Sequence, residues 1–244
     1  MKAQPVKKLD PERPLYENAA RTVRTRLKEL RAFEGPAVEN GVMEAQHDMR
    51  IAAKRLRYVL EATELCFGSA AKTARRRTRD LQDILGELHD CDVMRPRVQE
   101  HVRDLREQDA EQVRLRAGGA PDLDPRLAAR ARHRTAYRGL DVLDVYLAAR
   151  RKLLEERFFE FWREQESAGT WDRLDEEAGG LLDRAKASRR AAKRAQKARQ
   201  ELAIAQAAER EAAERAREAA ERLESARRSS PRGSGASDGQ SAPG

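Results

Sequence analysis

The chain has 244 residues, of which 38% are charged and 5% aromatic, and its 50 Lys and Arg outnumber its 42 Asp and Glu by eight. No apolar run approaches the ~18 residues that a membrane-spanning helix needs, and the first residues lack the apolar segment of a signal peptide. Two cysteines, Cys66 and Cys91, are too few for a disulfide framework. We therefore expect a soluble cytoplasmic protein without a cofactor or a membrane partner.

Helix-forming residues dominate the sequence, and alternating strand patterns are missing from it. These features predict an all-α fold, an antiparallel helical bundle, because the connections between the first four predicted helices are short. Five helices are expected in chain order, at residues 14–33, 42–67, 70–94, 97–116 and 126–166. Pro96 is expected to end the third helix, and the fifth is expected to bend near Gly139.

The C-terminal region differs from this bundle. Residues 12–166 are interpreted as one helical domain, and residues 167–180 as a linker. Residues 181–228 form a predicted charged helix or weak coiled coil, whose apolar positions are nearly all alanine and which therefore has almost no face to bury. Within it, residues 184–199 contain eight basic residues and no acidic one. Residues 229–244, rich in Ser, Gly and Pro, are predicted to be a disordered tail.

Charge is segregated along the chain. Residues 12–79 hold 15 basic and 9 acidic residues, residues 80–180 hold 17 and 23, and residues 181–228 hold 14 and 8. A basic front and a basic back thus flank an acidic middle. Because the first 180 residues are nearly neutral overall, an anion site there depends on where the cations are placed rather than on net charge.

Basic residues follow one face of each of the first three predicted helices. At 100° per residue, the second helix turns its apolar side chains to the core and carries a basic row beside them, at i, i+3, i+7 and i+10. This row is His47, Arg50, Lys54 and Arg57, and its counterpart on the first helix is Arg21, Arg24, Lys28 and Arg31. The third helix carries Lys72, Arg75, Arg76 and Arg79.

A row of like charges on a helix is usually a solvated surface. Two features favour an anion site here: the rows contain no acidic residue, and antiparallel packing can bring three of them together. Converging cations repel one another unless an anion joins them. Arg supplies bidentate contacts to phosphate and Lys a point charge, and a spacing of one helical turn suits an extended polyanion.

Two stretches resemble the signature sequences of the CHAD family, a histidine-containing α-helical domain. The first is QHDMRIAAKRLRYVLE, residues 46–61, and the second is LQDILGELHDCDV, residues 81–93. The resemblance implies packed helical bundles with a basic groove or channel, and non-catalytic binding of inorganic polyphosphate. It implies that the row from His47 to Arg57 binds the anion. For the other two rows, anion binding is expected only from the spacing of their basic residues.

The family typically has two related halves, and this chain shows one complete signature. The fifth helix is a candidate for a degenerate second half through its His133, Arg134, Tyr137, Arg138, Arg150 and Arg151. A shortened domain, or a homodimer that completes the channel, also fits the pattern. The ligand class depends less on this choice than the geometry of the channel does.

Other interpretations of single residues stay open. His89, Asp90 and Asp92 suggest a metal site, although a polar cluster at a helix end is the commoner role for adjacent ligands. His47 is either a packing residue or a phosphate donor that binds better when protonated. P-loop, Rossmann and nucleophile-elbow patterns are missing from the sequence, so enzyme activity is disfavoured.

Nucleic acid is the main alternative ligand. Phosphate contacts from Lys and Arg give affinity without sequence choice, so weak DNA or RNA binding is expected of residues 184–199. Base recognition needs polar or aromatic side chains among the cations, and only Tyr58 lies close to the rows. A coiled-coil scaffold built on residues 181–228 is disfavoured by their few Leu and Ile. Polyphosphate binding would place the protein at polyphosphate granules.

Overall fold

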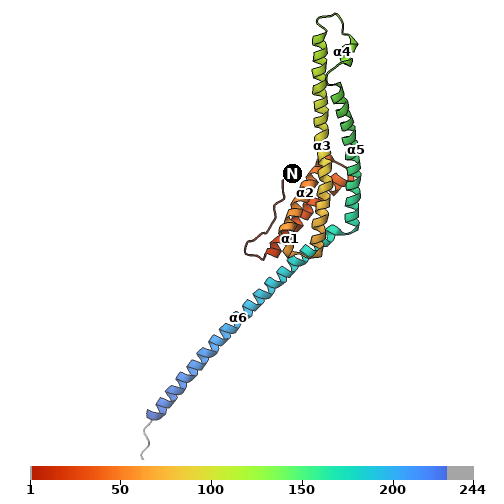
Figure 1. Ribbon diagram of the computed structural model, residues 1–244. Helices are drawn as coiled ribbons and strands as arrows, with labels where there is room; N and C mark the ends of the chain where they lie inside the picture. Colours follow the sequence, from red (N-terminus) through yellow and green to blue (C-terminus); the bar gives the residue numbers. More distant parts are fainter. Residues whose placement is uncertain (1, 230–244) are drawn as a thin grey trace, which may run out of the picture. The chain divides into compact units, whose positions relative to one another are not determined.

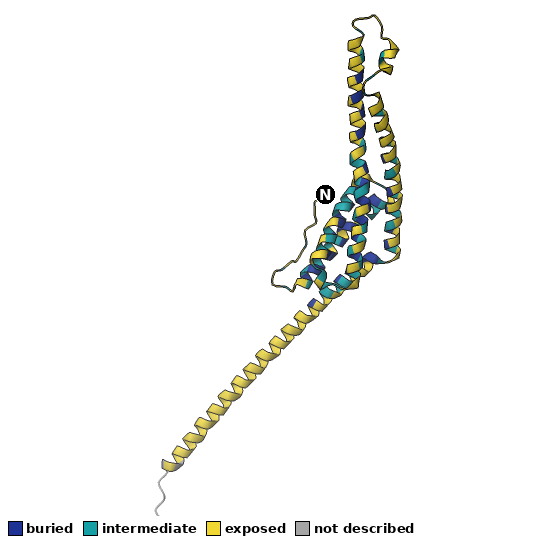
Figure 2. Ribbon diagram, viewed as in Figure 1, coloured by how far each residue is buried: buried dark blue, intermediate teal, exposed yellow. Residues whose placement is uncertain are grey.

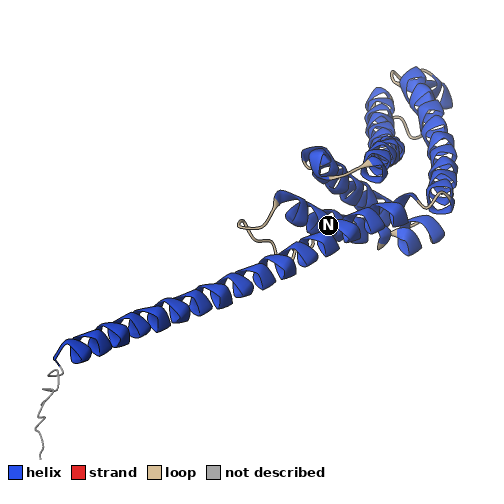
Figure 3. Ribbon diagram, turned by 90° about the horizontal axis from the view of Figure 1, so that it is seen from below, coloured by secondary structure: helices blue, strands red, loops and turns tan. Residues whose placement is uncertain are grey.

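The computed structural model describes residues 2–229, and the predicted all-α class is confirmed for them (Figures 1 and 3). The helices are α1 (Leu15–Arg31), α2 (Met43–Ala62), α3 (Ser69–Arg116), α4 (Pro125–Ala129), α5 (Arg134–Ser167) and α6 (Thr170–Ser229). A π-helical segment, η1 (Glu34–Glu39), joins α1 to α2, and a 3₁₀ turn, η2 (Glu64–Cys66), joins α2 to α3. Most of the predicted disordered tail, residues 230–244, lies outside the described residues.

The chain divides into two compact units, with the boundary between Ala185 and Lys186. In the first unit, α2 packs between α1 and α3, and α3 packs on α5. The core gathers one apolar face from each of these helices and from the first turns of α6. Its fully buried large side chains include Leu30, Met49, Leu56, Leu60, Leu81, Leu85, Leu88, Phe158, Trp162, Trp171 and Leu174. The α2 face predicted from helical spacing is thus the face that is buried.

The third and fourth predicted helices are one helix, so the predicted end before Pro96 is wrong. Proline inside a helix removes a hydrogen bond and costs about 3 kcal/mol. Nevertheless α3, which is 48 residues long, continues through Pro96 without a break. Leu88 and Cys91 are buried before the proline, and Val98 and Val102 after it. Packing on both sides of Pro96 therefore outweighs the local preference.

The fifth predicted helix is interrupted at residues 130–133, between α4 and α5, rather than bent at Gly139. A tertiary contact fixes this boundary. The buried carboxylate of Asp109, on α3, accepts hydrogen bonds from the backbone N–H of His133 at 3.0 and 3.2 Å. This carboxylate satisfies a backbone donor at the start of α5, a position where helices lack internal partners.

Residues 167–180, the predicted linker, instead hold the end of α5 and the first turns of α6. Only Ala168 and Gly169 separate the two helices, and Gly169 takes a φ of +61°, which glycine adopts readily. Trp171 is 1% exposed and stacks on Trp162 with ring centroids 5.6 Å apart. The start of α6 is therefore part of the packed first unit.

The second unit is a helix without a buried face. Every side chain described from Lys186 onward is exposed (Figure 2). Alanine and ion pairs at i, i+4 spacing, such as Lys197 with Glu201 at 3.6 Å and Glu211 with Arg215 at 3.5 Å, support it locally. Among the described helices, none combines the length and the apolar character that crossing a membrane requires.

Candidate anion-binding site

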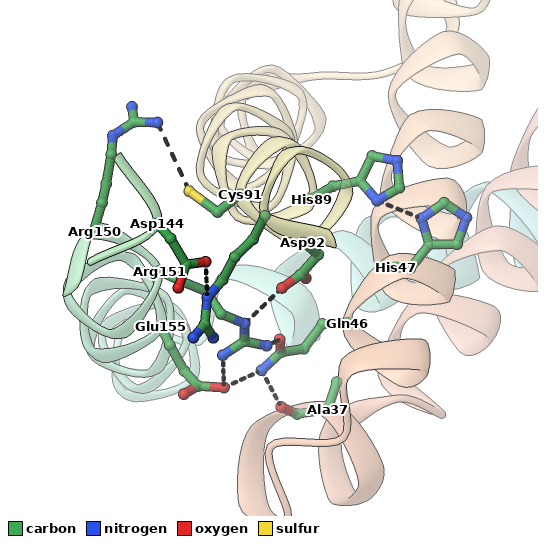
Figure 4. A network of polar contacts seen from close by, with 11 residues as sticks. Ala37, Gln46, His47, His89, Cys91, Asp92, Asp144, Arg150, Arg151 and Glu155 are labelled. Carbon is green, nitrogen blue, oxygen red and sulfur yellow. Dashed lines mark hydrogen bonds and ion pairs between the residues drawn. The ribbon is translucent and has the colours of Figure 1, made fainter. Parts of the chain in front are cut away.

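Two histidines join α2 to α3. Nδ1 of His47 lies 3.2 Å from Nδ1 of His89, and the ring centroids are 4.5 Å apart (Figure 4). One ring must donate and the other accept, so this hydrogen bond requires at least one neutral imidazole. Burial, followed by the charges of His47 and Arg50, lowers the pKa of His89. The pair therefore resists taking a second positive charge.

The basic row of α2 continues along α3 from this pair. A methyl group built on Gly86 of α3 would lie 3.7 Å from Nε of Arg50, so the guanidinium borders the α3 backbone there. Further on, Nε of Arg57 donates to Oε1 of Gln82 at 2.5 Å. Rising residue numbers on α2 thus meet falling numbers on α3, as expected for antiparallel neighbours. We call this line of contact the α2–α3 seam.

The basic row of α3 lies on the same side of its helix as the seam. Residues three or four positions apart are neighbours on a helix surface. Arg79, Gln82, Gly86 and His89 are spaced in this way, and Arg76 and Lys72 extend the series backwards. The rows predicted on α2 and α3 are therefore brought together at the seam.

Carboxylates neutralise only part of this surface. Arg57 pairs with Glu61 at 2.9 Å, and Arg75 pairs with Glu64 at 2.8 Å. Five other basic residues have no carboxylate within 4.0 Å in the part of the chain that the structure describes: Arg50, Lys54, Lys72, Arg76 and Arg79. We call these five the seam cations. Arg50 is half-buried and the other four are exposed, so they present positive charge to solvent.

The basic row of α1 has a different environment. Nε and Nη2 of Arg24 donate to the two carboxylate oxygens of Asp175 at 2.7 and 2.9 Å. Arg31 donates to Asp172 at 2.6 Å and to Glu166 at 3.4 Å. These acids come from the end of α5 and the start of α6, more than 130 positions away in the sequence. They neutralise cations of a row that itself contains no acidic residue.

The remaining residues of this row differ from each other: Arg21 forms an ion pair and Lys28 faces solvent. Arg21 donates to the buried Glu17 at 2.8 Å, and Lys28 is exposed. All four residues of the row line an open cleft together with Asp172, Asp175 and Glu176 of α6. Arg24 and Arg31 thus donate to Asp175 and Asp172 beside this cleft, whereas the α2 and α3 rows meet at the seam.

Arg151 of α5 connects the two signature stretches. Its Nε donates to Asp92 at 2.6 Å, its Nη2 donates to Gln46 at 3.1 Å, and its Nη1 lies 3.1 Å from Glu155 (Figure 4). Gln46 in turn donates to Glu155 at 2.9 Å. Two carboxylates surround this guanidinium, so Arg151 positions α2 and α3 rather than offering charge to a ligand. No local signal reveals this role, because Asp92 and Gln46 are far away in sequence.

Two other candidates of the predicted fifth helix, Arg150 and His133, are also engaged in internal contacts. Arg150 donates to Glu87 at 2.5 Å, and Nδ1 of His133 lies 3.0 Å from Asp109. His89, Asp90 and Asp92 do not form a set of metal ligands, because Asp92 binds Arg151. Within the described chain, there is no group of three or more His, Cys, Asp or Glu side chains that could hold a metal ion.

The adjacency of the two signature stretches agrees with the comparison to known families. The family model of the CHAD domain matches residues 2–99. The chain carries a CHAD domain. Neither the curated proteins nor the solved structures include a significant match. The matched region holds α1, α2 and α3 as far as residue 99, so the histidine pair and all seam cations lie inside the CHAD domain.

Acidification should destabilise the CHAD domain through the histidine pair. The pKa of His89 is lower in the folded protein than its ordinary ~6.5, so the unfolded chain binds the proton more readily. Stability is therefore lost as the pH falls below about 6.5. His89→Gln should flatten the dependence of the melting temperature on pH between about pH 7.5 and 5.5. His101→Gln, an exposed histidine on the same helix, is the control. An unchanged slope in His89→Gln would contradict the role of the pair.

Proposed function

We propose that this protein binds inorganic polyphosphate without catalysis, through the seam cations of its CHAD domain. The CHAD domain is associated with polyphosphate binding as a family. The observation that carries the proposal for this chain is the group of five basic residues on adjacent helices with no carboxylate partner among the described residues. Mutual repulsion of these cations is relieved when a polyanion lies between them.

The chemistry of the seam suits phosphate. Arg50, Arg76 and Arg79 present planar guanidinium groups that can hold two phosphate oxygens at once, and Lys54 and Lys72 add point charges. The cations recur about every turn, or ~5.4 Å, along two antiparallel helices. A chain of linked phosphates meets such a surface at several points, while a single phosphate meets one or two. Longer chains should therefore bind more tightly, and binding should weaken steeply with salt.

The α1 row is assigned a structural role in this proposal. Phosphate binding to Arg24 or Arg31 would have to replace hydrogen bonds to Asp175, Asp172 and Glu166. Those carboxylates would then face the polyanion without a partner, which opposes binding. The predicted groove of three helices is thus narrowed to the seam, with Lys28 the one member of the α1 row that has no carboxylate partner among the described residues.

A competition assay tests the choice between polyphosphate and nucleic acid. At a fixed salt concentration, long-chain polyphosphate should displace a labelled polyphosphate probe at lower phosphate concentration than duplex DNA or RNA does. The reason is that the seam has cations in rows but few side chains that stack on or read bases. Equal competition by DNA or RNA would favour the alternative, charge-driven nucleic-acid binding by residues 184–199.

A further inference from the structure

A row of apolar side chains on α5 faces solvent. It consists of Val142, Val145, Tyr146, Ala149 and Leu153, at i, i+3, i+4, i+7 and i+11. Val142, Val145 and Leu153 are 66%, 69% and 66% exposed, and Tyr146 is 57% exposed. The opposite face of α5 already packs in the core through its own buried side chains, Leu147, Leu154, Phe158 and Trp162. A helix with a second, exposed apolar face is typical of an interaction surface.

Charged residues border this row in an ordered way. At 100° per residue, Arg138, Asp141, Lys152 and Glu156 lie on one side of the row's centre line, and Val142 and Leu153 lie on the other. Arg138 and Asp141 precede Val142, the first apolar residue of the row, and Lys152 and Glu156 lie on either side of Leu153, the last one. Arg138, Lys152 and Glu156 are exposed and have no ion-pair partner among the described residues. Along the chain, a basic residue is therefore followed by an acidic one at the N-terminal end of the row, and the same order recurs at its C-terminal end.

We propose that α5 packs antiparallel against α5 of a second copy of this chain. With a two-fold axis level with Leu147, Arg138 faces Glu156 of the partner subunit, and Asp141 faces Lys152 of the partner subunit. On the other side of the same interface, Val142 meets Leu153 of the partner subunit. Two-fold symmetry repeats each contact, giving four ion pairs around a continuous apolar strip. Asp141 can serve two cations, because its Oδ2 bonds Arg106 at 2.9 Å and Oδ1 stays available.

The charge pattern distinguishes this arrangement from others. In a parallel pair, the flank that carries Arg138, Lys152 and Glu156 would face the opposite flank of the partner helix, so the pairs Arg138 with Glu156 and Asp141 with Lys152 could not form. A lipid surface would favour basic residues flanking the apolar row, whereas here acids and bases alternate. A surface whose charges complement themselves after a two-fold rotation indicates a second copy of the same chain. This inference is independent of the ligand that the α2–α3 seam binds.

Sedimentation velocity of the full chain over a wide range of protein concentration tests the proposal. The unmodified protein should form dimers reversibly. Leu153→Asp should raise the dimer dissociation constant by about a hundredfold, because it removes apolar packing at two symmetric positions and buries a charge at each. Leu202→Asp, at a similarly exposed position on α6, is the matched control and should leave dimerisation unchanged. The melting temperature of each variant verifies that it folds.

Charge reversal tests the antiparallel register. Arg138→Glu and Glu156→Arg should each weaken the dimer, because each places like charges opposite one another twice. The double variant, Arg138→Glu with Glu156→Arg, should restore dimerisation, since it exchanges the two partners of each pair. A protein that stays monomeric at all concentrations overturns the proposal. A dimer that neither Leu153→Asp nor the single reversals weaken overturns it too, as does a double variant weaker than either single one.

Discussion

Replacing Arg50, Lys54 and Arg79 together by alanine is expected to lower polyphosphate affinity by about a hundredfold. Removing each charge-assisted hydrogen bond to phosphate costs about 1 kcal/mol at this partly exposed surface, and 1.4 kcal/mol corresponds to a factor of ten. The three side chains have no carboxylate partners among the described residues, so their removal leaves no acid unpaired and should not unfold the domain. Fluorescence anisotropy with labelled long-chain polyphosphate measures the change.

The salt dependence of the same titration adds a second measurement. Each phosphate that the variant no longer neutralises should reduce the slope of log affinity against log salt by about one. The matched control removes three exposed arginines from the part of α3 beyond Pro96, namely Arg97, Arg103 and Arg116. It lowers the net charge equally but leaves the seam intact. If both triple variants lose the same affinity, binding depends on net charge and the seam has no special role.

Trp171→Ala is expected to destabilise the first unit by about 3–5 kcal/mol, the usual cost of removing a large buried aromatic side chain. Trp171 is 1% exposed and stacks on Trp162, in a segment that the sequence pattern assigns to a linker. A linker residue would cost almost nothing to replace. Urea unfolding, followed through the fluorescence of the remaining Trp162, measures the difference in the free energy of unfolding.

Leu202→Ala provides the comparison for this prediction. Leu202 belongs to the same helix, α6, but is 59% exposed, and its replacement should change stability by less than about 0.5 kcal/mol. A small effect at both positions would mean that the first turns of α6 are not held in the core. A large effect at Trp171 alone would place the end of the packed unit between Trp171 and Leu202, a range that contains the boundary at Ala185 and Lys186.

The helix-forming composition predicted the fold class, and the anion-binding role of the basic rows stays a prediction. Helical periodicity was sufficient for the buried face of α2 and for the positions of the basic rows on α2 and α3, because each depends on spacing within one helix. It was not sufficient for the α1 row. Arg24 and Arg31 lack acidic residues in their own row, and their partners Asp175 and Asp172 become adjacent only when the first turns of α6 pack beside α1. Long-range ion pairs leave no local pattern, so a row of cations in sequence overstates the positive charge available in the structure.

The errors in helix boundaries have the same origin. Pro96 and Gly139 are reliable signals of local preference, yet α3 and α5 pass through both positions. The actual interruption before α5 is fixed by Asp109, which is buried on another helix. His89 was recognised as part of a polar cluster, but its contact with His47 requires α2 and α3 to be in register. Packing between helices determines these features.

The exposed helix from Lys186 onward affects which spectroscopic signal reports the unfolding of the first unit. Because this segment buries nothing, its helicity depends on alanine and on weak local ion pairs, so it frays gradually on heating. Circular dichroism sums this loss with the unfolding of the first unit and therefore shows a broad, composite transition. The two tryptophans of the chain, Trp162 and Trp171, are both buried in the first unit. Their emission reports cooperative unfolding of that unit alone.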